Sequence, residues 1–114
     1  RVRVGWRARI KRRLTRRDAR YSGGLVAGAK ILELFGDAAT ALCLRETGGR
    51  DEGLLRAYRE VEFLRPVFAG DTVEVTATIT KVGRTSRTIK FVVMKGAGRR
   101  RRRAVTAIGT VVVS

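Results

Sequence analysis

The sequence predicts an α+β domain in which an antiparallel five-stranded sheet wraps around one long central helix. Residues 25–44 are apolar at spacings of three and four, the period of an α-helix, and only a narrow charged stripe interrupts them. Runs rich in Val, Thr and Ile flank this segment on both sides and alternate between apolar and polar residues. A helix that is apolar around most of its circumference needs cover, and one curled sheet supplies it.

The length and composition limit what this domain contains. We expect residues 1–114 to form a single domain with a small core, and therefore a homodimer or a larger even oligomer. No stretch is long and apolar enough to span a membrane. The chain has no histidine and its one cysteine is Cys43, so we expect neither a disulfide nor a metal site, and a cytoplasmic location.

The charge balance is strongly basic, with 26 Lys and Arg against 10 Asp and Glu and a formal net charge of +16. Such a balance favours anionic partners, such as nucleic acid, anionic lipid or a phosphate-bearing cofactor. The arginines gather in residues 1–17 and 99–103, and no aromatic residues alternate with them as a base-stacking surface requires. We therefore interpret most of them as a solvated surface and do not expect a nucleic acid partner.

The first half of the chain gives a strand, a turn and the helix. Residues 2–14 alternate and predict a half-buried strand whose inner face carries Val2, Val4, Trp6, Ala8 and Ile10. A polar loop with Asp18 follows, and residues 22–24 form a turn directly before the helix. Residues 47–53, rich in glycine, end the helix.

The second half predicts four strands. Residues 54–64 have strand character, although their first half also fits a helix. In a strand, Ala57, Arg59, Val61 and Phe63 would lie on the same face. Pro66 ends this pattern. Residues 72–82 and 87–95 alternate strictly around the turn at 83–86 and predict a hairpin. A glycine and arginine connection at 96–103 leads to a final strand at 104–114.

The turn before the helix is a candidate binding site for a ligand oxygen. The first N–H groups of a helix lack internal partners and lie at its positive end. Without side chains, Gly23 and Gly24 let an oxygen approach the N–H groups of Gly24 and Leu25. An anion or a polarised carbonyl oxygen fits such a place. The alternative interpretation is that the two glycines only form a tight turn.

This order of elements, with its motifs, resembles the hotdog fold of acyl-CoA thioesterases and related enzymes. Asp18, then Gly-Gly-x-Leu from Gly23, then Asp37 is similar to the acyl-CoA hydrolases, in which an Asn or Asp precedes this helix start and an acid follows on the helix. The segments VEFLRPV at 61–67 and VGRTS at 82–86 are similar to the same branch. The resemblance covers nearly the whole chain.

Four further motifs narrow the resemblance within that fold: DARY at 18–21, LVAGA at 25–29, FGD at 35–37 and DEGLLRAY at 51–58. With these motifs the chain resembles the β-aminoacyl-CoA ammonia-lyases. This resemblance implies elimination of ammonia from a short 3-aminoacyl-CoA, with coenzyme A as part of the substrate and no permanently bound cofactor. The sequence departs from the family pattern at Arg20, Gly24 and Ala27. Thioester hydrolysis therefore stays open as an alternative, and a non-catalytic basic module that binds nucleic acid is a third.

Ammonia elimination needs an oxyanion site, a base and a protonated leaving amine. The N–H groups at Gly24 and Leu25 are candidates for the first need. Asp37 and Asp18 are candidate bases, because an apolar site raises the pKa of a carboxylate, and Tyr21 is a candidate for orienting the substrate or assisting proton transfer. Hydrolysis uses the same parts. Asp37 also fits a solvated helix acid, and Asp18 a capping residue.

The phosphates of coenzyme A need cationic partners. Candidates at the predicted hairpin turn are Arg84, Thr85, Ser86 and Arg87, and the arginines of residues 99–103 are a second set. The resemblance also implies that each site is built between two subunits, with the glycine turn of one chain facing the acid of its partner.

Overall fold

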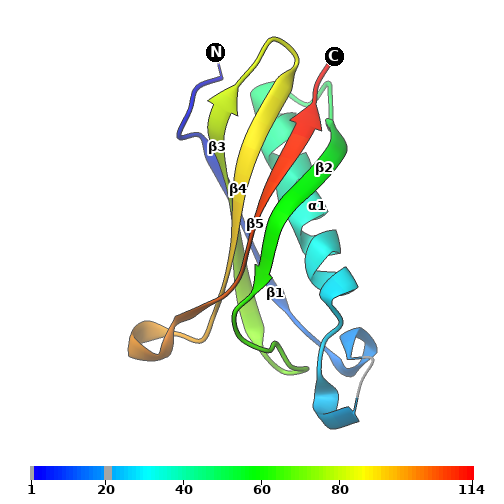
Figure 1. Cartoon of the computed structure of the whole chain (residues 1–114), viewed down its shortest axis with the longest axis vertical. Helices are drawn as coiled ribbons and strands as arrows, with labels where there is room; N and C mark the ends of the chain where they lie inside the picture. The colour runs from blue at the N-terminus through cyan, green and yellow to red at the C-terminus, as the bar shows by residue number, and fades with distance from the viewer. Residues whose placement is uncertain (1, 20–21) are drawn as a thin grey trace.

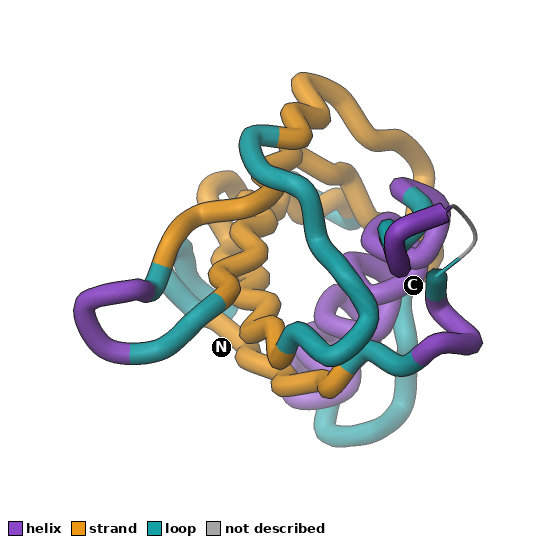
Figure 2. Tube along the Cα trace, turned by 90° about the horizontal axis from the view of Figure 1, so that it is seen from below, coloured by secondary structure: helices purple, strands orange, loops and turns teal. Residues whose placement is uncertain are grey.

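The computed structural model describes residues 2–19 and 22–114. Within them the chain forms one α-helix, α1 (Gly28–Glu46), and five strands: β1 (Arg7–Arg13), β2 (Leu54–Phe63), β3 (Thr72–Val82), β4 (Ser86–Lys95) and β5 (Arg102–Val112). Every pair of neighbouring strands is antiparallel, in the order β1-β3-β4-β5-β2. The sheet curves around α1 (Figures 1 and 2), which confirms the predicted fold class.

The core lies between α1 and the inner face of the sheet. Phe35 on α1 stacks against Phe91 on β4 with ring centroids 4.9 Å apart, and Tyr58 on β2 meets Phe91 edge-on at 5.9 Å. The Tyr58 hydroxyl donates to the Leu32 carbonyl oxygen at 3.0 Å, and burial raises the pKa of Tyr58 to about 12, so the hydroxyl keeps its proton. Among the described residues, no helix is both long and apolar enough to cross a membrane.

Gly109 on β5 leaves room for this aromatic cluster. A Cβ added there would lie 2.6 Å from Phe91 Cε2 and 3.4 Å from Tyr58 Cδ1. Because Phe35 stacks against Phe91, the ring has little room to retreat, and we expect Gly109→Ala to lower the free energy of unfolding by about 1–3 kcal/mol in urea denaturation. The control is Gly36→Ala on α1, where nothing lies within 4 Å of the new methyl group. An equal loss in both variants would contradict this account of Gly109.

The helix begins three residues later than the sequence predicts. Leu25 and Val26 are extended: Leu25 forms a β-bridge with Phe68, and the Val26 N–H donates to the Val67 carbonyl oxygen at 2.8 Å. The predicted start at residue 25 is therefore wrong, and α1 begins at Gly28. The physical reason is that residues 67–69 form β-type hydrogen bonds with the backbone N–H and C=O groups of residues 24–26. Those groups are then not available for helical hydrogen bonds.

Two predicted strand faces also differ from the structure. Val4 is 64% exposed, because Gly5 adopts a φ of 97° and β1 begins only at Arg7. In β2 the register shifts between Arg59 and Glu62, and Glu60 adopts a φ of 53°. This bulge puts Tyr58 and Val61 against the core and leaves Arg59 exposed, so the predicted parity of β2 is wrong.

Candidate functional site

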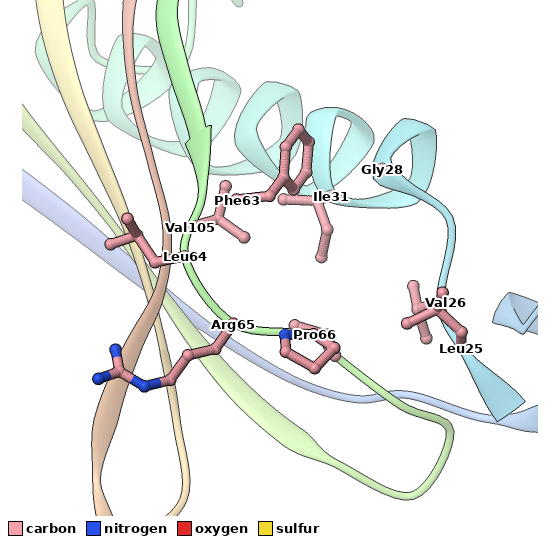
Figure 3. Close-up of a pocket in the computed structure, with 10 residues that line it drawn as sticks. Leu25, Val26, Gly28, Ile31, Phe63, Leu64, Arg65, Pro66 and Val105 are labelled. Atoms are coloured by element: carbon pink, nitrogen blue, oxygen red, sulfur yellow. The ribbon is translucent and has the colours of Figure 1, made fainter. Parts of the chain in front are cut away.

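An apolar pocket of about 410 Å³ lies at the N-terminal end of α1, between the helix and the segment that follows β2 (Figure 3). Arg65 is the one charged residue of its lining. The lining consists of Leu25, Val26, Gly28, Ile31, Phe63, Leu64, Arg65, Pro66, Val67 and Val105. A pocket with this lining suits a short apolar chain with a polar group at its mouth.

The far wall of the pocket is fixed by backbone hydrogen bonds. The N–H groups of Leu64 and Arg65 donate to the Ala104 carbonyl oxygen at 2.8 and 3.1 Å, and Lys95 Nζ donates to the Pro66 carbonyl oxygen at 2.6 Å. Gly28 on α1 faces the Phe63 ring, since a Cβ there would lie 3.0 Å from Phe63 Cζ. Only a residue without a side chain lets the helix start approach this ring so closely.

The glycine turn lies beside the pocket but outside the helix. Gly23 and Gly24 adopt φ values of 77° and 79° in a short 3-10 turn, and Leu25 lines the pocket. The first N–H groups of α1 instead belong to Gly28 and Ala29, so the positive end of the helix dipole lies at the pocket itself. The sequence analysis did not identify Gly28 as a lining residue. A glycine inside the predicted helix was the available signal, because glycine there often marks a close approach of another group.

The carboxylate of Asp18 is engaged by two partners within its own chain. Its Oδ2 accepts a hydrogen bond from the Thr15 backbone N–H at 2.8 Å, and its Oδ1 lies 3.4 Å from Lys30 Nζ. The Thr15 backbone hydrogen bond is the main cause that holds the pKa of Asp18 below its usual value; burial acts in the opposite direction, and the Lys30 charge adds to the lowering. Asp18 does not line the apolar pocket, so this geometry favours the capping interpretation over a base.

Asp37 is exposed on the charged stripe of α1 with Lys30 and Glu33. Within residues 2–19 and 22–114 its carboxylate makes no side-chain hydrogen bond or ion pair. It lies nine residues beyond Gly28, roughly 14 Å along the helix axis, so one chain does not bring it to the pocket. The predicted Tyr21 lies outside the described residues.

The predicted coenzyme A turn lies at the other end of the sheet (Figure 1). Ser86 pairs with Val112 on β5, whereas the pocket residue Val105 pairs with Val93. Val112 lies seven residues beyond Val105 along β5, a distance of roughly 23 Å. Arg84 and Thr85 are exposed in this turn.

Arg87, by contrast, is buried and fully engaged. Its Nε and Nη2 donate to the Glu46 carboxylate at the end of α1, with distances of 2.7–3.1 Å. Its Nη1 donates to the carbonyl oxygens of Gly83 and Ser86 at 3.1 and 2.9 Å. All three guanidinium nitrogens are therefore used inside the protein, and Arg87 holds the turn instead of offering itself to a phosphate.

The pocket lining offers backbone groups and the Arg65 guanidinium, and no carboxylate among the described residues of the same chain lines it. In the part of the chain that the structure describes, no group of three His, Cys, Asp or Glu side chains is placed to hold a metal ion. Burial raises the pKa of the Cys43 thiol to about 11, so it stays protonated and is a poor nucleophile.

Comparison with known sequences gives a family and a relative. Residues 23–101 match the thioesterase superfamily. The chain is 54% identical over 82 residues to 3-aminobutyryl-CoA ammonia lyase of Acetoanaerobium sticklandii. This match covers 72% of the chain and 64% of the relative, so it spans less than two thirds of that protein.

Comparison with solved structures gives the same fold. The β-alanyl-CoA:ammonia lyase of Clostridium propionicum superimposes with a TM-score of 0.86 at 30% identity, covering 97% of this chain and 87% of that one. A hexameric thioesterase from Yersinia pestis matches with a TM-score of 0.83 at 24% identity, over 96% and 88% of the two chains. An acyl-CoA hydrolase from Staphylococcus aureus matches with a TM-score of 0.83 at 16% identity, over 94% and 65%.

Proposed function

The chain belongs to the thioesterase superfamily, and on that premise we propose that it eliminates ammonia reversibly from a short 3-aminoacyl-CoA to give the 2-enoyl-CoA. The observation that carries this proposal is the 54% identity to a 3-aminobutyryl-CoA ammonia lyase. The solved β-alanyl-CoA:ammonia lyase adds support, because its identity of 30% extends over nearly the whole chain. The apolar pocket agrees with a short acyl chain.

The proposed reaction places the thioester oxygen near the N–H groups of Gly24 and Leu25, beside the positive end of α1 at Gly28. A carboxylate removes the proton α to the thioester, and the electron pair passes to the thioester oxygen as an enolate that the N–H groups stabilise. The enolate then forms the carbon–carbon double bond as the carbon–nitrogen bond of the protonated amine breaks with its electrons on nitrogen. The departing ammonia takes the proton from the carboxylate and leaves as ammonium, which returns the base to its starting state. We assign the carboxylate to Asp37 of a second copy, because Asp37 cannot reach the pocket of its own chain.

A homodimer, or a larger even oligomer, is part of this proposal. β2 is an edge strand of the sheet, and the apolar side chains on and beside it are exposed: Leu54 by 72%, Phe63 by 56% and Leu64 by 49%. An edge with unpaired backbone groups and apolar side chains is suited to pairing with a second copy. If two β2 strands paired antiparallel, the two copies would be related by a two-fold axis and would run in opposite directions. The α1 helix of the second copy would then pass the pocket of the first.

We expect light scattering at micromolar concentration to give twice the 12.6 kDa of one chain, or a larger even multiple. The physical reason is the apolar edge at β2, which a monomer would leave in water. A monodisperse monomer that is fully active would contradict both the oligomer and the shared site.

Thioester hydrolysis is the second candidate, favoured by the superfamily match, because the same oxyanion donors and carboxylate would serve it. One assay separates the candidates: incubation with crotonyl-CoA and ammonium, followed by mass spectrometry for the amine adduct and a colour reagent for free thiol. Amine adduct without thiol supports the lyase, and thiol release supports the thioesterase. Neither product, together with salt-sensitive oligonucleotide binding, would support a basic nucleic-acid module.

A further inference from the structure

The mouth of the apolar pocket adjoins the arginine-rich connection between β4 and β5. Arg65 lines the pocket, and its Nη1 donates to the Arg103 carbonyl oxygen at 2.6 Å. Figure 3 shows the Arg65 guanidinium directed away from the apolar side chains and toward the beginning of β5. The N–H groups of Leu64 and Arg65 also donate to the Ala104 carbonyl oxygen, so backbone hydrogen bonds join the pocket wall to the end of the basic segment.

The backbone of this connection is held in a tight, ordered turn. The Arg100 N–H donates to the Ala97 carbonyl oxygen at 3.0 Å, and the Arg101 N–H donates to the Gly98 carbonyl oxygen at 3.2 Å. Gly96 adopts a φ of 82°, and a Cβ there would lie 2.6 Å from the Arg100 carbonyl oxygen. The arginine side chains therefore project from a fixed turn, which lowers the entropy cost of binding a ligand.

Some cations of the segment have partners inside the protein. Arg101 pairs with Glu74 on β3, and Arg102 Nη1 donates to the carbonyl oxygens of Arg99 and Arg101 at 2.7 and 3.0 Å. In residues 2–19 and 22–114, the side chains of Arg99, Arg100 and Arg103 make no hydrogen bond or ion pair, and all three are exposed. Their guanidinium groups are thus available to an anion from outside.

We propose that Arg65, Arg99, Arg100 and Arg103 bind the phosphates of the coenzyme A nucleotide, while the thioester end of the same substrate occupies the apolar pocket. This inference rests on the proposed function. Coenzyme A joins a flexible, largely uncharged arm to a diphosphate and a further phosphate, so it needs an apolar cavity next to a cluster of cations. Arginine is the side chain best matched to phosphate, because its planar group donates two parallel hydrogen bonds.

The sequence offers two sets of cations for the phosphates, and this assignment places them on the arginines of residues 99–103 instead of the predicted hairpin turn. The turn at residues 83–86 lies at the opposite end of the sheet, and its Arg87 is used internally. Arg84 of a second copy remains the rival, because end-over-end pairing would bring that turn toward the pocket. The two assignments predict different effects of arginine replacement.

The test uses the full chain and compares acyl-CoA with an acyl-pantetheine thioester as substrates, and coenzyme A with dephospho-coenzyme A as ligands. In the variant Arg99→Gln with Arg100→Gln and Arg103→Gln, we expect the ratio of kcat/KM for acyl-CoA to that for acyl-pantetheine to fall about 10- to 100-fold. Calorimetric titration should show that the variant no longer distinguishes coenzyme A from dephospho-coenzyme A. Arg65→Gln should produce a smaller fall in the same direction.

The matched control removes the same charge elsewhere: Arg7→Gln and Arg9→Gln on the edge strand β1, with Arg3→Gln in the segment before it. We expect its ratio to stay within about 2-fold of wild type, since net charge alone acts weakly at physiological ionic strength. An equal fall in the control, or loss of nucleotide discrimination in Arg84→Gln alone, would overturn the assignment. Loss of oligonucleotide binding in the triple variant with coenzyme A binding unchanged would overturn it in favour of a nucleic acid surface.

Failure of the proposed function is distinguishable from failure of this assignment. If wild type converts no acyl thioester by elimination or hydrolysis, the proposed reaction fails. Titration with free coenzyme A and dephospho-coenzyme A still decides where the phosphates bind.

Discussion

Replacement of Asp37 by asparagine is expected to lower turnover about 100- to 10,000-fold, because asparagine keeps the size of the side chain but cannot accept a proton. The fold should tolerate the change. Asp37 is exposed and its side chain makes no hydrogen bond or ion pair among the described residues, so we expect a change of less than about 0.5 kcal/mol in the free energy of unfolding. Steady-state rates with both candidate reactions, together with a coenzyme A titration, measure the two effects separately.

Glu33→Gln is the matched control for Asp37→Asn. Glu33 lies one turn earlier on the same stripe of α1, and its exposed ion pair with Lys30 at 3.2 Å contributes only about 0.2–1 kcal/mol. We expect wild-type turnover in this control. Wild-type turnover in Asp37→Asn as well would remove Asp37 from the mechanism and leave Asp18 as the remaining carboxylate, despite its bonds to Thr15 and Lys30.

The distance of Asp37 from the pocket gives this prediction a second test. A shared site requires Asp37 from one chain and the glycine turn from the other, so two inactive chains can complement each other. Mixing Asp37→Asn with Gly24→Ala, which strains a residue at φ 79°, should restore about a quarter of wild-type activity after random reassociation into dimers. No recovery above the separate variants would indicate that each chain carries its own complete site.

The sheet is the part of the fold that the sequence predicts best. The predicted strand at residues 72–82 coincides with β3, and the hairpin partner at 87–95 differs from β4 by one residue. These strands lie inside the sheet with one face against the core. The alternation of apolar and polar residues in the sequence therefore matches the alternation of buried and exposed side chains. β2 is an edge strand with a bulge at Glu60. The bulge adds a residue to the strand, so the side chains after it point to the opposite face from the one that simple alternation predicts.

The site could be predicted only in part, because its parts are joined by contacts distant in sequence. Gly23, Gly24 and Leu25 do lie beside a cavity, but the segment at 67–69 that forms β-type hydrogen bonds with residues 24–26 gives no local signal. The pocket wall likewise depends on a hydrogen bond from Leu64 to Ala104, which is forty residues away in the sequence. Arg87 and Glu46 are 41 residues apart, so composition and spacing do not show that they are paired.

That pair gives the second large expected effect, on stability. Glu46 and Arg87 side chains are only 6% and 9% exposed, and the closest contact joins Arg87 Nη2 to Glu46 Oε2 at 2.7 Å. Removing one partner leaves the other charge buried without compensation, so we expect Glu46→Ala to lower the free energy of unfolding by about 3–5 kcal/mol. In a chain of 114 residues this corresponds to a fall in Tm of more than about 10 °C in a thermal melt.

The exposed pair of Lys30 and Glu33 is the reference for this effect, with side chains 27% and 62% exposed. Solvent screens it, so Glu33→Ala should lower the free energy of unfolding by no more than about 1 kcal/mol. A similar small loss in Glu46→Ala would show that water reaches the Arg87 guanidinium and compensates its charge.

The two partners of the buried pair are not equivalent. Arg87 also donates to the carbonyl oxygens of Gly83 and Ser86, so Arg87→Met removes the donors of a turn as well as a charge. The apolar double variant, Glu46→Leu with Arg87→Met, removes both charges and should recover much of the loss seen in Glu46→Ala. The remaining deficit, about 1–3 kcal/mol if those carbonyls stay dry, then measures what Arg87 contributes to holding the β3–β4 turn closed. Full recovery would mean that Arg87 stabilises the end of α1 alone and that the turn keeps its shape without it.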